Sequence, residues 1–465
     1  MDKSREQYIK MTQTPVHKLI LQLAVPTILS MMATTIYNLV DTAFVGTLGN
    51  SASGAVGIVF GFMSILQAIG FMFGQGSGSL LSRKLGARDG EAASKTASTG
   101  FIFSFGLGAI VAVICFIFIE PLVRILGSTE TIAPYAITYI KYILATAPFV
   151  VSSFTLNNML RYEGKAKLGM IGLISGGVLN IGGDYLFMFV FNMGIAGAGL
   201  STAISQVISF FILLIMFLKG KTLSKLSFKY FAPGNGLLKE IVLIGFPSLL
   251  RQALSSITTI LLNSQSAFYA GDAGVAAMSI VNRIAFFLFA IALGIGQGFQ
   301  PVCAFNYGAK KYKRQRDAYK FTMILSILIL AVLTIITMFF ADGLIAVFRD
   351  DPTVIEIGTR ALKILSIAQI FMPLCMVTEM LMQSSGKKGA ASLLSSLRGG
   401  ILFIPALLIL PYFRGMYGVE EAQPLAYVLS VIPALFIAKR YFRKTPDEDF
   451  PDNEEEKNEV EDFDG

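Results

Sequence analysis

Long apolar runs, separated by short polar segments, recur along the whole chain and set its predicted architecture. Each run is close to the twenty or so residues that an α-helix needs to cross the hydrocarbon core of a bilayer. We therefore predict an all-α polytopic membrane protein with twelve transmembrane helices. The predicted spans lie near residues 19–45, 52–74, 96–119, 137–156, 168–191, 195–218, 241–270, 273–299, 321–340, 361–382, 393–412 and 419–438.

The composition supports this class and excludes several functions. Of the 465 residues, 54% are hydrophobic and 15% are charged, which is typical of membrane proteins and not of soluble globular domains. The single histidine, His17, excludes a histidine-based metal site or catalytic triad, and the chain has no GxxxxGK[ST] phosphate-binding loop. The three cysteines fall in separate apolar runs without metal-ligand spacing. We therefore expect neither an enzyme nor a bound cofactor.

The charged residues predict the topology. Basic residues gather after the even-numbered spans, as in Arg83, Lys84 and Arg88 after the second, and few follow the odd-numbered spans. The positive-inside rule then places both termini in the cytoplasm, for a multi-pass protein of the cell membrane. Because these charges are scattered over short loops, they do not indicate nucleic-acid binding. The end of the chain, from Asp447 to Gly465, is strongly acidic and is predicted to be disordered.

Short motifs recur at a fixed displacement, which indicates two homologous halves. Gly74-Gln75-Gly76 recurs as Gly296-Gln297-Gly298, and Gly86-Ala87 recurs as Gly308-Ala309 at the same displacement. Six spans per half give both halves the same membrane orientation, so we expect two six-helix lobes related by a pseudo-two-fold axis along the membrane normal. The predicted domains are a cytoplasmic N-terminus (1–18), an N-lobe (19–218, spans one to six), a cytoplasmic linker (219–240), a C-lobe (241–438, spans seven to twelve) and a disordered cytoplasmic tail, basic and then acidic (439–465). This layout is typical of a secondary transporter.

One face of the fifth predicted span carries the candidate chemistry. Asp184 lies in an otherwise apolar stretch, and a carboxylate at membrane depth costs about 2.5 to 3.5 kcal/mol. Asn180 is one helical turn earlier on the same face. At about 1.5 Å per residue, Asp41 and Thr202 reach a similar depth in the outer half of the N-lobe. These four residues predict a site for a sodium ion, or for a proton shared by two carboxylates. A hydrogen bond between helices is the alternative interpretation.

Two further residues of the first span are accessory candidates. Tyr37 lies one turn before Asp41, so it can face the same chamber. Pro26 cannot donate to the helical hydrogen-bond ladder, which predicts a bend in this span.

The second half lacks these acids and carries other charges at membrane depth. At the displacement of the repeat, Asp184 corresponds to Pro405 or Ala406, so the acidic pair is not duplicated. Arg251, Arg283 and Glu379 are the candidates for a charged cavity in the C-lobe. We expect Glu379 to pair with one of the two arginines, either as a structural ion pair or as part of a substrate contact.

The motifs, taken in order, resemble a known transporter family. They are YNLVD at 37–41, GQG at 74–76 with LGARD at 85–89, NIGGD at 180–184, GAGLSTAISQ at 197–206 and GQGFQPVCAFNYGAKK at 296–311. Together they resemble the multidrug and toxic compound extrusion (MATE) family, on its DinF-type bacterial branch. The resemblance covers all twelve spans.

This resemblance implies export of amphiphilic, often cationic small molecules, driven by inward flow of sodium ions or protons through the N-lobe. The cation-site positions of the family correspond to Asp41, Asn180, Asp184 and Thr202. We expect a protein that acts as a monomer in the lipid bilayer on small drug or toxin molecules. The alternatives are a lipid-linked oligosaccharide flippase of the same superfamily, a non-transporting receptor or scaffold, and, least favoured, an intramembrane enzyme.

Overall fold

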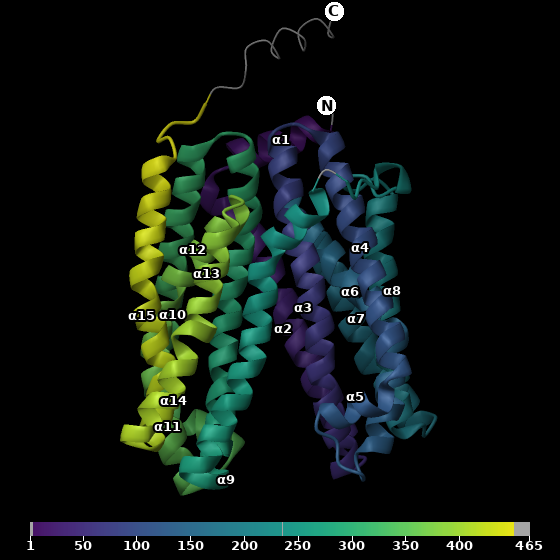
Figure 1. Ribbon diagram of the computed structural model, residues 1–465, viewed down its shortest axis with the longest axis vertical. Coiled ribbons are helices and arrows are strands. Elements are labelled where there is room, and N and C mark those ends of the chain that lie inside the picture. The colour runs from purple at the N-terminus through teal and green to yellow at the C-terminus, as the bar shows by residue number, and fades with distance from the viewer. Residues whose placement is uncertain (1–2, 235, 451–465) are drawn as a thin grey trace, which may run out of the picture.

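The computed structural model describes residues 3–234 and 236–450, and every regular element within them is a helix (Figure 1). The elements are α1 (Lys3–Gln13), α2 (Val16–Gly46), α3 (Asn50–Gly86), α4 (Gly90–Ile117), α5 (Ile119–Ile125), α6 (Ala133–Tyr162), α7 (Ala166–Asp184), η1 (Tyr185–Val190), α8 (Gly194–Leu218), η2 (Phe228–Tyr230), α9 (Leu237–Gly308), α10 (Tyr312–Phe348), α11 (Pro352–Gln369), α12 (Met372–Ser384), α13 (Lys388–Ser396), η3 (Leu397–Ile401), α14 (Phe403–Arg414) and α15 (Met416–Lys444).

The helices of the described residues account for the twelve predicted spans. Ten continuous helical segments are long and apolar enough to cross a membrane, counting α7 with η1 (Ala166–Val190) and α13 with η3 and α14 (Lys388–Arg414) as one segment each. One of them, α9, changes direction at Gly271, whose φ of 58° and ψ of −150° interrupt the helix, so it supplies two spans. The remaining span is the pair α11 and α12, which is bent by 47° between them.

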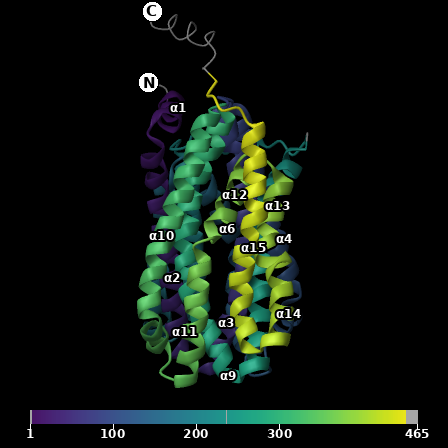
Figure 2. The same ribbon diagram turned by 90° about the vertical axis from the view of Figure 1, so that its left-hand side faces the viewer.

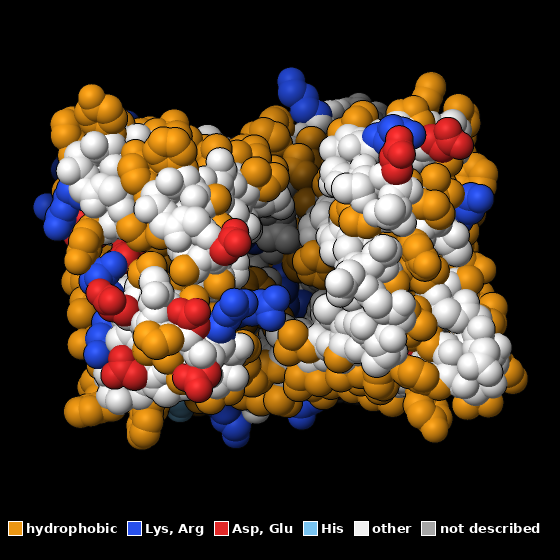
Figure 3. All heavy atoms as spheres, turned by 90° about the horizontal axis from the view of Figure 1, so that it is seen from below, with side chains coloured by type: hydrophobic (Ala, Val, Ile, Leu, Met, Phe, Trp, Pro, Cys, Tyr) orange, Lys and Arg blue, Asp and Glu red, His pale blue; other side chains and the backbone are white. Residues whose placement is uncertain are grey.

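Two lobes stand side by side, with α2–α8 forming the N-lobe and α9–α15 the C-lobe (Figure 1). Seen from the left-hand side of that view, the helices of the C-lobe lie in front of those of the N-lobe (Figure 2). The helix α1 and the C-terminal end of α15 lie at the same end of the molecule, which we call the terminal end (Figure 1). The helix α5 and the turn of α9 lie at the opposite end. A view onto the opposite end shows a hollow between the two lobes (Figure 3).

The backbone conformation of the turns recurs in the two halves at the same displacement in sequence as the motifs. Residues with positive φ occur in equivalent turns of the two lobes, and they include non-glycine residues, which rarely adopt this conformation. The pairs at the displacement of the motifs are Gly49 and Gly271, Arg88 and Lys310, and Gly164 and Gly386, while Gly194 and Gly415 differ from it by a single position. The turns between spans are therefore duplicated together with the spans, which confirms the internal repeat.

Glycines of the repeated motifs hold the lobes together at the terminal end. A Cβ atom on Gly76 would lie 2.0 Å from the carbonyl oxygen of Ile241, and one on Gly308 would lie 2.0 Å from that of Arg83. Only glycine permits two helix backbones to approach so closely. The contact between α3 and α9 is the most extensive between any two elements. It joins the lobes at this end, whereas the hollow of Figure 3 separates them at the other.

A polar network crosses the same junction. The side chain of Gln300 in α9 donates to Gln75 of α3 and to Gln383 of α12, each at 3.1 Å. Arg161, at the end of α6, donates to Gln297 of α9. All of these side chains are buried, so their hydrogen bonds fix the register of the two lobes.

The prediction of a disordered tail is wrong for its first residues, which the structure describes as helical. The helix α15 continues to Lys444, so residues 439–444 are helical. Beyond it, Asp449 accepts hydrogen bonds from the backbone of Lys313 and Arg314, at 2.9 and 3.3 Å, and so caps the start of α10. The prediction missed this contact because it was made from composition alone. Residues 451–465, the rest of the predicted tail, lie outside the described residues.

Candidate cation site in the N-lobe

Three helices bring the four predicted site residues together. Asp41 comes from α2, Asn180 and Asp184 from the last turns of α7, and Thr202 from α8. All four are buried, with exposed fractions of 8% for Asp41 and 0% for Asp184. The depth estimate from the sequence thus placed them correctly at one level.

A chain of polar contacts links these side chains. The amide of Asn180 donates to the carboxylate of Asp184 at 3.4 Å and to the hydroxyl of Thr202 at 3.2 Å. The hydroxyl of Tyr139, from α6, lies 3.4 Å from that of Thr202 and donates to Asp41 at 3.5 Å. Most of these distances exceed the range of about 2.7 to about 3.2 Å that is usual for a protein hydrogen bond. The cluster is therefore a loosely bonded chain of carboxylate, amide and hydroxyl groups.

The two carboxylates retain unused binding capacity. Asp41 Oδ1 and Asp184 Oδ2 are buried, and neither accepts a hydrogen bond from a described residue. The two carboxyl groups lie close enough for a hydrogen bond between them once one of them carries a proton. Two adjacent carboxylates cannot both be charged in an apolar setting without a cation between them. The geometry therefore suits a shared proton or a hard cation that oxygen atoms coordinate.

A local change of helix type follows the acid directly. Residues Tyr185–Val190 form a π-helix immediately after Asp184. Short π-helical turns inside α-helices are often found at functional sites because they redirect side chains. The preceding Gly183 lies against Ser201 of α8, where an added Cβ would approach its hydroxyl to 2.5 Å. Close packing of α7 on α8 therefore positions Asn180 and Asp184 against Thr202.

The accessory candidates lie on the same helix as Asp41. The ring of Tyr37 packs against Gly177 of α7, where an added Cβ would lie 2.9 Å from it. Pro26 is buried within α2, which continues past it as a single helix. Its neighbours Ala24 and Ile28 touch Gly298 and Gly294 of α9. The helix α2 thus contacts the cation site near one end and the lobe junction near the other.

The sequence analysis missed two members of the cluster. Tyr139 joins Asp41 to Thr202, and the hydroxyl of Ser201 donates to the backbone carbonyl of Asn180 at 2.9 Å. The same depth count would have found Tyr139, because it lies six residues, or about 9 Å, inside the start of α6. A tyrosine at this depth is common in apolar packing, so it gave no signal by itself.

The charged candidates of the C-lobe do not form one group. Arg251 donates to Glu379 at 2.6 Å, and both side chains are largely buried, so the ion pair expected at Glu379 is present. Arg283 is exposed and makes no ion pair with any residue that the structure describes. The sequence could not distinguish them because it does not specify which helix face packs inward.

Comparisons with known proteins give the family context. The family model MatE matches residues 26–186 and 247–430. The multidrug export protein MepA of Staphylococcus saprophyticus is 28% identical over 93% of this chain and 95% of its own length. MepA of Staphylococcus aureus strain N315 is 29% identical, with the same coverage. A solved structure described as the outward-facing conformation of a multidrug resistance MATE family transporter has a TM-score of 0.88 at 26% identity. It covers 93% of this chain and 97% of that one.

Proposed function

Because the chain belongs to the MatE family of multidrug and toxic compound extrusion transporters, we propose that it is a secondary active antiporter. It exports amphiphilic, cationic small molecules from the cell and exchanges them for sodium ions or protons. Its relatives MepA are multidrug export proteins, so the flippase alternative is not favoured. The placement on the DinF-type branch stays a prediction.

The observation that carries this proposal is the pair of buried carboxylates in the N-lobe. Asp41 and Asp184 come from different helices, and one oxygen of each lacks a hydrogen-bond donor among the described residues. A hydrogen bond between helices accounts for at most one oxygen of each carboxylate, and a second buried oxygen of a charged group without a donor destabilises the fold. A proton or sodium ion between the carboxylates, assisted by Asn180 and Thr202, removes this cost.

Exchange follows if the cation and the substrate stabilise different arrangements of the N-lobe. A ligand shifts a conformational equilibrium only through its different affinity for the two states. The helix α2 is suited to couple the site to the rest of the protein, because it carries Asp41 and also contacts α9 through Ala24 and Ile28. Pro26 lies between Ala24 and Ile28, and we propose it as the position where α2 bends during transport.

The test is efflux of a fluorescent cationic dye from proteoliposomes under an imposed sodium gradient or pH gradient, each applied alone. Asp184→Asn is expected to abolish gradient-driven efflux while leaving dye binding and folding largely intact, and Asp41→Asn should act in the same way. Asp272→Asn is the matched control, because this carboxylate is exposed near the turn of α9. Wild-type efflux by the Asp184→Asn protein under the same gradient would show that the site assignment is wrong.

A further inference from the structure

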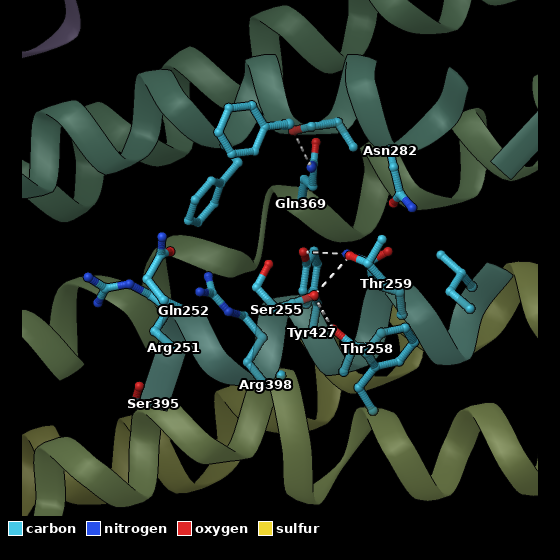
Figure 4. Close-up of a pocket in the computed structure, with 17 residues that line it drawn as sticks. Arg251, Gln252, Ser255, Thr258, Thr259, Asn282, Gln369, Ser395, Arg398 and Tyr427 are labelled. Atoms are coloured by element: carbon cyan, nitrogen blue, oxygen red, sulfur yellow. Dashed lines mark hydrogen bonds between the residues drawn. The ribbon is translucent and has the colours of Figure 1, made fainter. Parts of the chain in front are cut away.

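The C-lobe contains a polar cavity that the proposed function does not use. Its volume is about 190 Å³, and it lies between the two halves of α9, α11, α13, η3, α14 and α15 (Figure 4). Two arginines, Arg251 and Arg398, are among its lining residues, whereas no aspartate or glutamate lines it within the described part of the chain. Polar and aromatic side chains complete the wall.

The charge of this cavity is not balanced. Arg251 is neutralised by its contact with Glu379 at 2.6 Å, and in Figure 4 its guanidinium group points away from the other labelled side chains. Arg398 forms no ion pair with a described residue, and its Nη1 atom is buried without a hydrogen-bond partner among them. The cavity therefore carries one net positive charge with unused hydrogen-bonding capacity.

Aromatic rings compensate only part of the cost of this partly buried charge. The guanidinium carbon of Arg398 lies 5.3 Å from the ring centre of Phe289 and 5.8 Å from that of Tyr427. Such cation–π contacts are favourable but supply no hydrogen-bond acceptor in the plane of the guanidinium group. A charged side chain at membrane depth that lacks a protein partner commonly marks a substrate or ion pathway.

Neutral groups near Arg398 are also available to a ligand. The side chains of Gln252 and Ser255 point toward the same part of the cavity as Arg398 (Figure 4) and form no hydrogen bond with another described residue. The amide nitrogen of Gln369 donates to the carbonyl of Ala285 at 3.1 Å, which leaves its Oε1 atom as a buried acceptor without a donor. The cavity thus presents neutral polar side chains around one cation, and the unpaired Oε1 atom of Gln369 on the facing wall.

The cavity includes C-lobe counterparts of cation-site residues. At the displacement that relates Gly194 to Gly415, Thr202 corresponds to Gln423, and Asp41 corresponds to Leu262, or to Asn263 at the displacement of the motifs; Gln423 and Leu262 line the cavity. The cavity therefore lies near the level in the C-lobe that the candidate cation site has in the N-lobe. It contains no counterpart of the two acids, and arginines from other positions line it.

We propose that this cavity binds the carboxylate group of an amphiphilic substrate, an assignment that rests on the proposed export function. A carboxylate carries the single negative charge that Arg398 requires, and the planar guanidinium group can bind it through two parallel hydrogen bonds. The cavity is smaller than the roughly 300–1,000 Å³ of pockets that enclose drug-sized ligands. It therefore holds one end of the molecule, and the substrates of this exporter include carboxylates and zwitterions as well as cations.

The test measures equilibrium binding to the purified full-length protein in phosphatidylcholine nanodiscs, with no gradient. The probes are dansyl-labelled undecanoate and its methyl ester, which differ in the charge of one end. The wild type is expected to bind the carboxylate at least about tenfold more tightly than the ester, because hydrogen bonds to charged groups are the stronger ones. Arg398→Gln should remove this preference and leave ester binding unchanged, and Arg398→Lys should retain part of it.

The control variant is Arg283→Gln, which removes an exposed arginine of the same lobe outside the cavity and should keep the full preference. Equal wild-type affinity for the two probes, or an Arg398→Gln protein that keeps the preference, overturns the proposal. If Arg398→Gln does not fold, the wild-type comparison and Arg398→Lys decide the question.

Phosphatidylglycerol in the nanodisc supplies a competing anion. If it abolishes carboxylate binding but not ester binding, the cavity holds a lipid phosphodiester, and the assignment to a substrate carboxylate is wrong. The binding assay has no gradient and reports on the cavity of the C-lobe, whereas the efflux assay reports on the cation site of the N-lobe. A failure of the cation-site assignment in the efflux assay is therefore distinguishable from a failure at this cavity.

Discussion

Removal of one member of the Arg251–Glu379 pair should destabilise the protein more than removal of one member of an exposed ion pair. The two side chains are 10% and 2% exposed, and their charged atoms lie 2.6 Å apart. Glu379→Gln leaves the guanidinium group buried without its counter-ion, and such a loss costs about 3 to 5 kcal/mol of unfolding free energy. Arg251→Leu in the same chain removes the orphaned charge, so the double variant should recover part of that loss.

The assay can use the cysteines of the protein, because the chain contains no tryptophan. Cys303 and Cys375 are buried, and Cys115 is partly exposed. In a Cys115→Ala background, a dye that fluoresces on reaction with thiols therefore reports unfolding as the temperature rises. The single and double variants together form a double-mutant cycle.

The pair between Arg414 and Glu421 provides the matched control. It has a similar separation of 2.7 Å, but its side chains are 56% and 26% exposed, so its coupling should be only about 0.2 to 1 kcal/mol. If the effects at Arg251 and Glu379 are strictly additive, or no larger than those at the exposed pair, the inference that burial makes this ion pair important is refuted.

Two further predictions concern the lobe junction and the topology. Gly76→Ala should destabilise the protein by about 1 to 3 kcal/mol, because the new Cβ would meet the Ile241 carbonyl at 2.0 Å. Gly57→Ala, in the same helix with nothing within 4 Å, should be neutral or stabilising in the same thermal assay, and equal effects at both sites would contradict the close-approach argument. Single cysteines introduced near Asn50, Asn192 or Gly271 should react with an impermeant reagent outside intact cells, whereas those near Arg88 or Lys313 should not. The opposite labelling pattern would reverse the orientation.

The twelve spans could be predicted because a bilayer imposes one strong requirement, which is length of apolar sequence. The ends of the helices could not be predicted in the same way. The predicted second span ends at residue 74, yet α3 continues to Gly86 through a stretch rich in glycine and serine. This stretch has low helix propensity, and its helix is stabilised by packing against α9 across the lobe junction. Such a contact between distant segments has no local signature.

The residues of the candidate cation site could be selected from the sequence for a related reason. Carboxylates at membrane depth are rare enough to be noticed singly, so Asp41 and Asp184 stood out, and a depth count brought Thr202 to them. Tyr139 carries no such signal, because an aromatic side chain is ordinary in a membrane helix. Its place between Asp41 and Thr202 depends on the rotation of α6 about its own axis. For the same reason the sequence could not show that Arg283 lies outside the cavity, since the rotation of its helix about its own axis decides which way the side chain faces.

The repeat explains the shape of each lobe but not its charge. At the displacement of the repeated GQG motif, Arg251 corresponds to Leu29 and Arg398 to Gly176 of the N-lobe, just as Asp184 corresponds to Ala406 of the C-lobe. Neither polar site could therefore be inferred from the other by symmetry. The equivalent backbones place buried polar groups at a similar level in each lobe, with acids in the N-lobe and arginines in the C-lobe. Under the two proposals made above, a cation and a substrate carboxylate bind in different lobes and need not compete for one site.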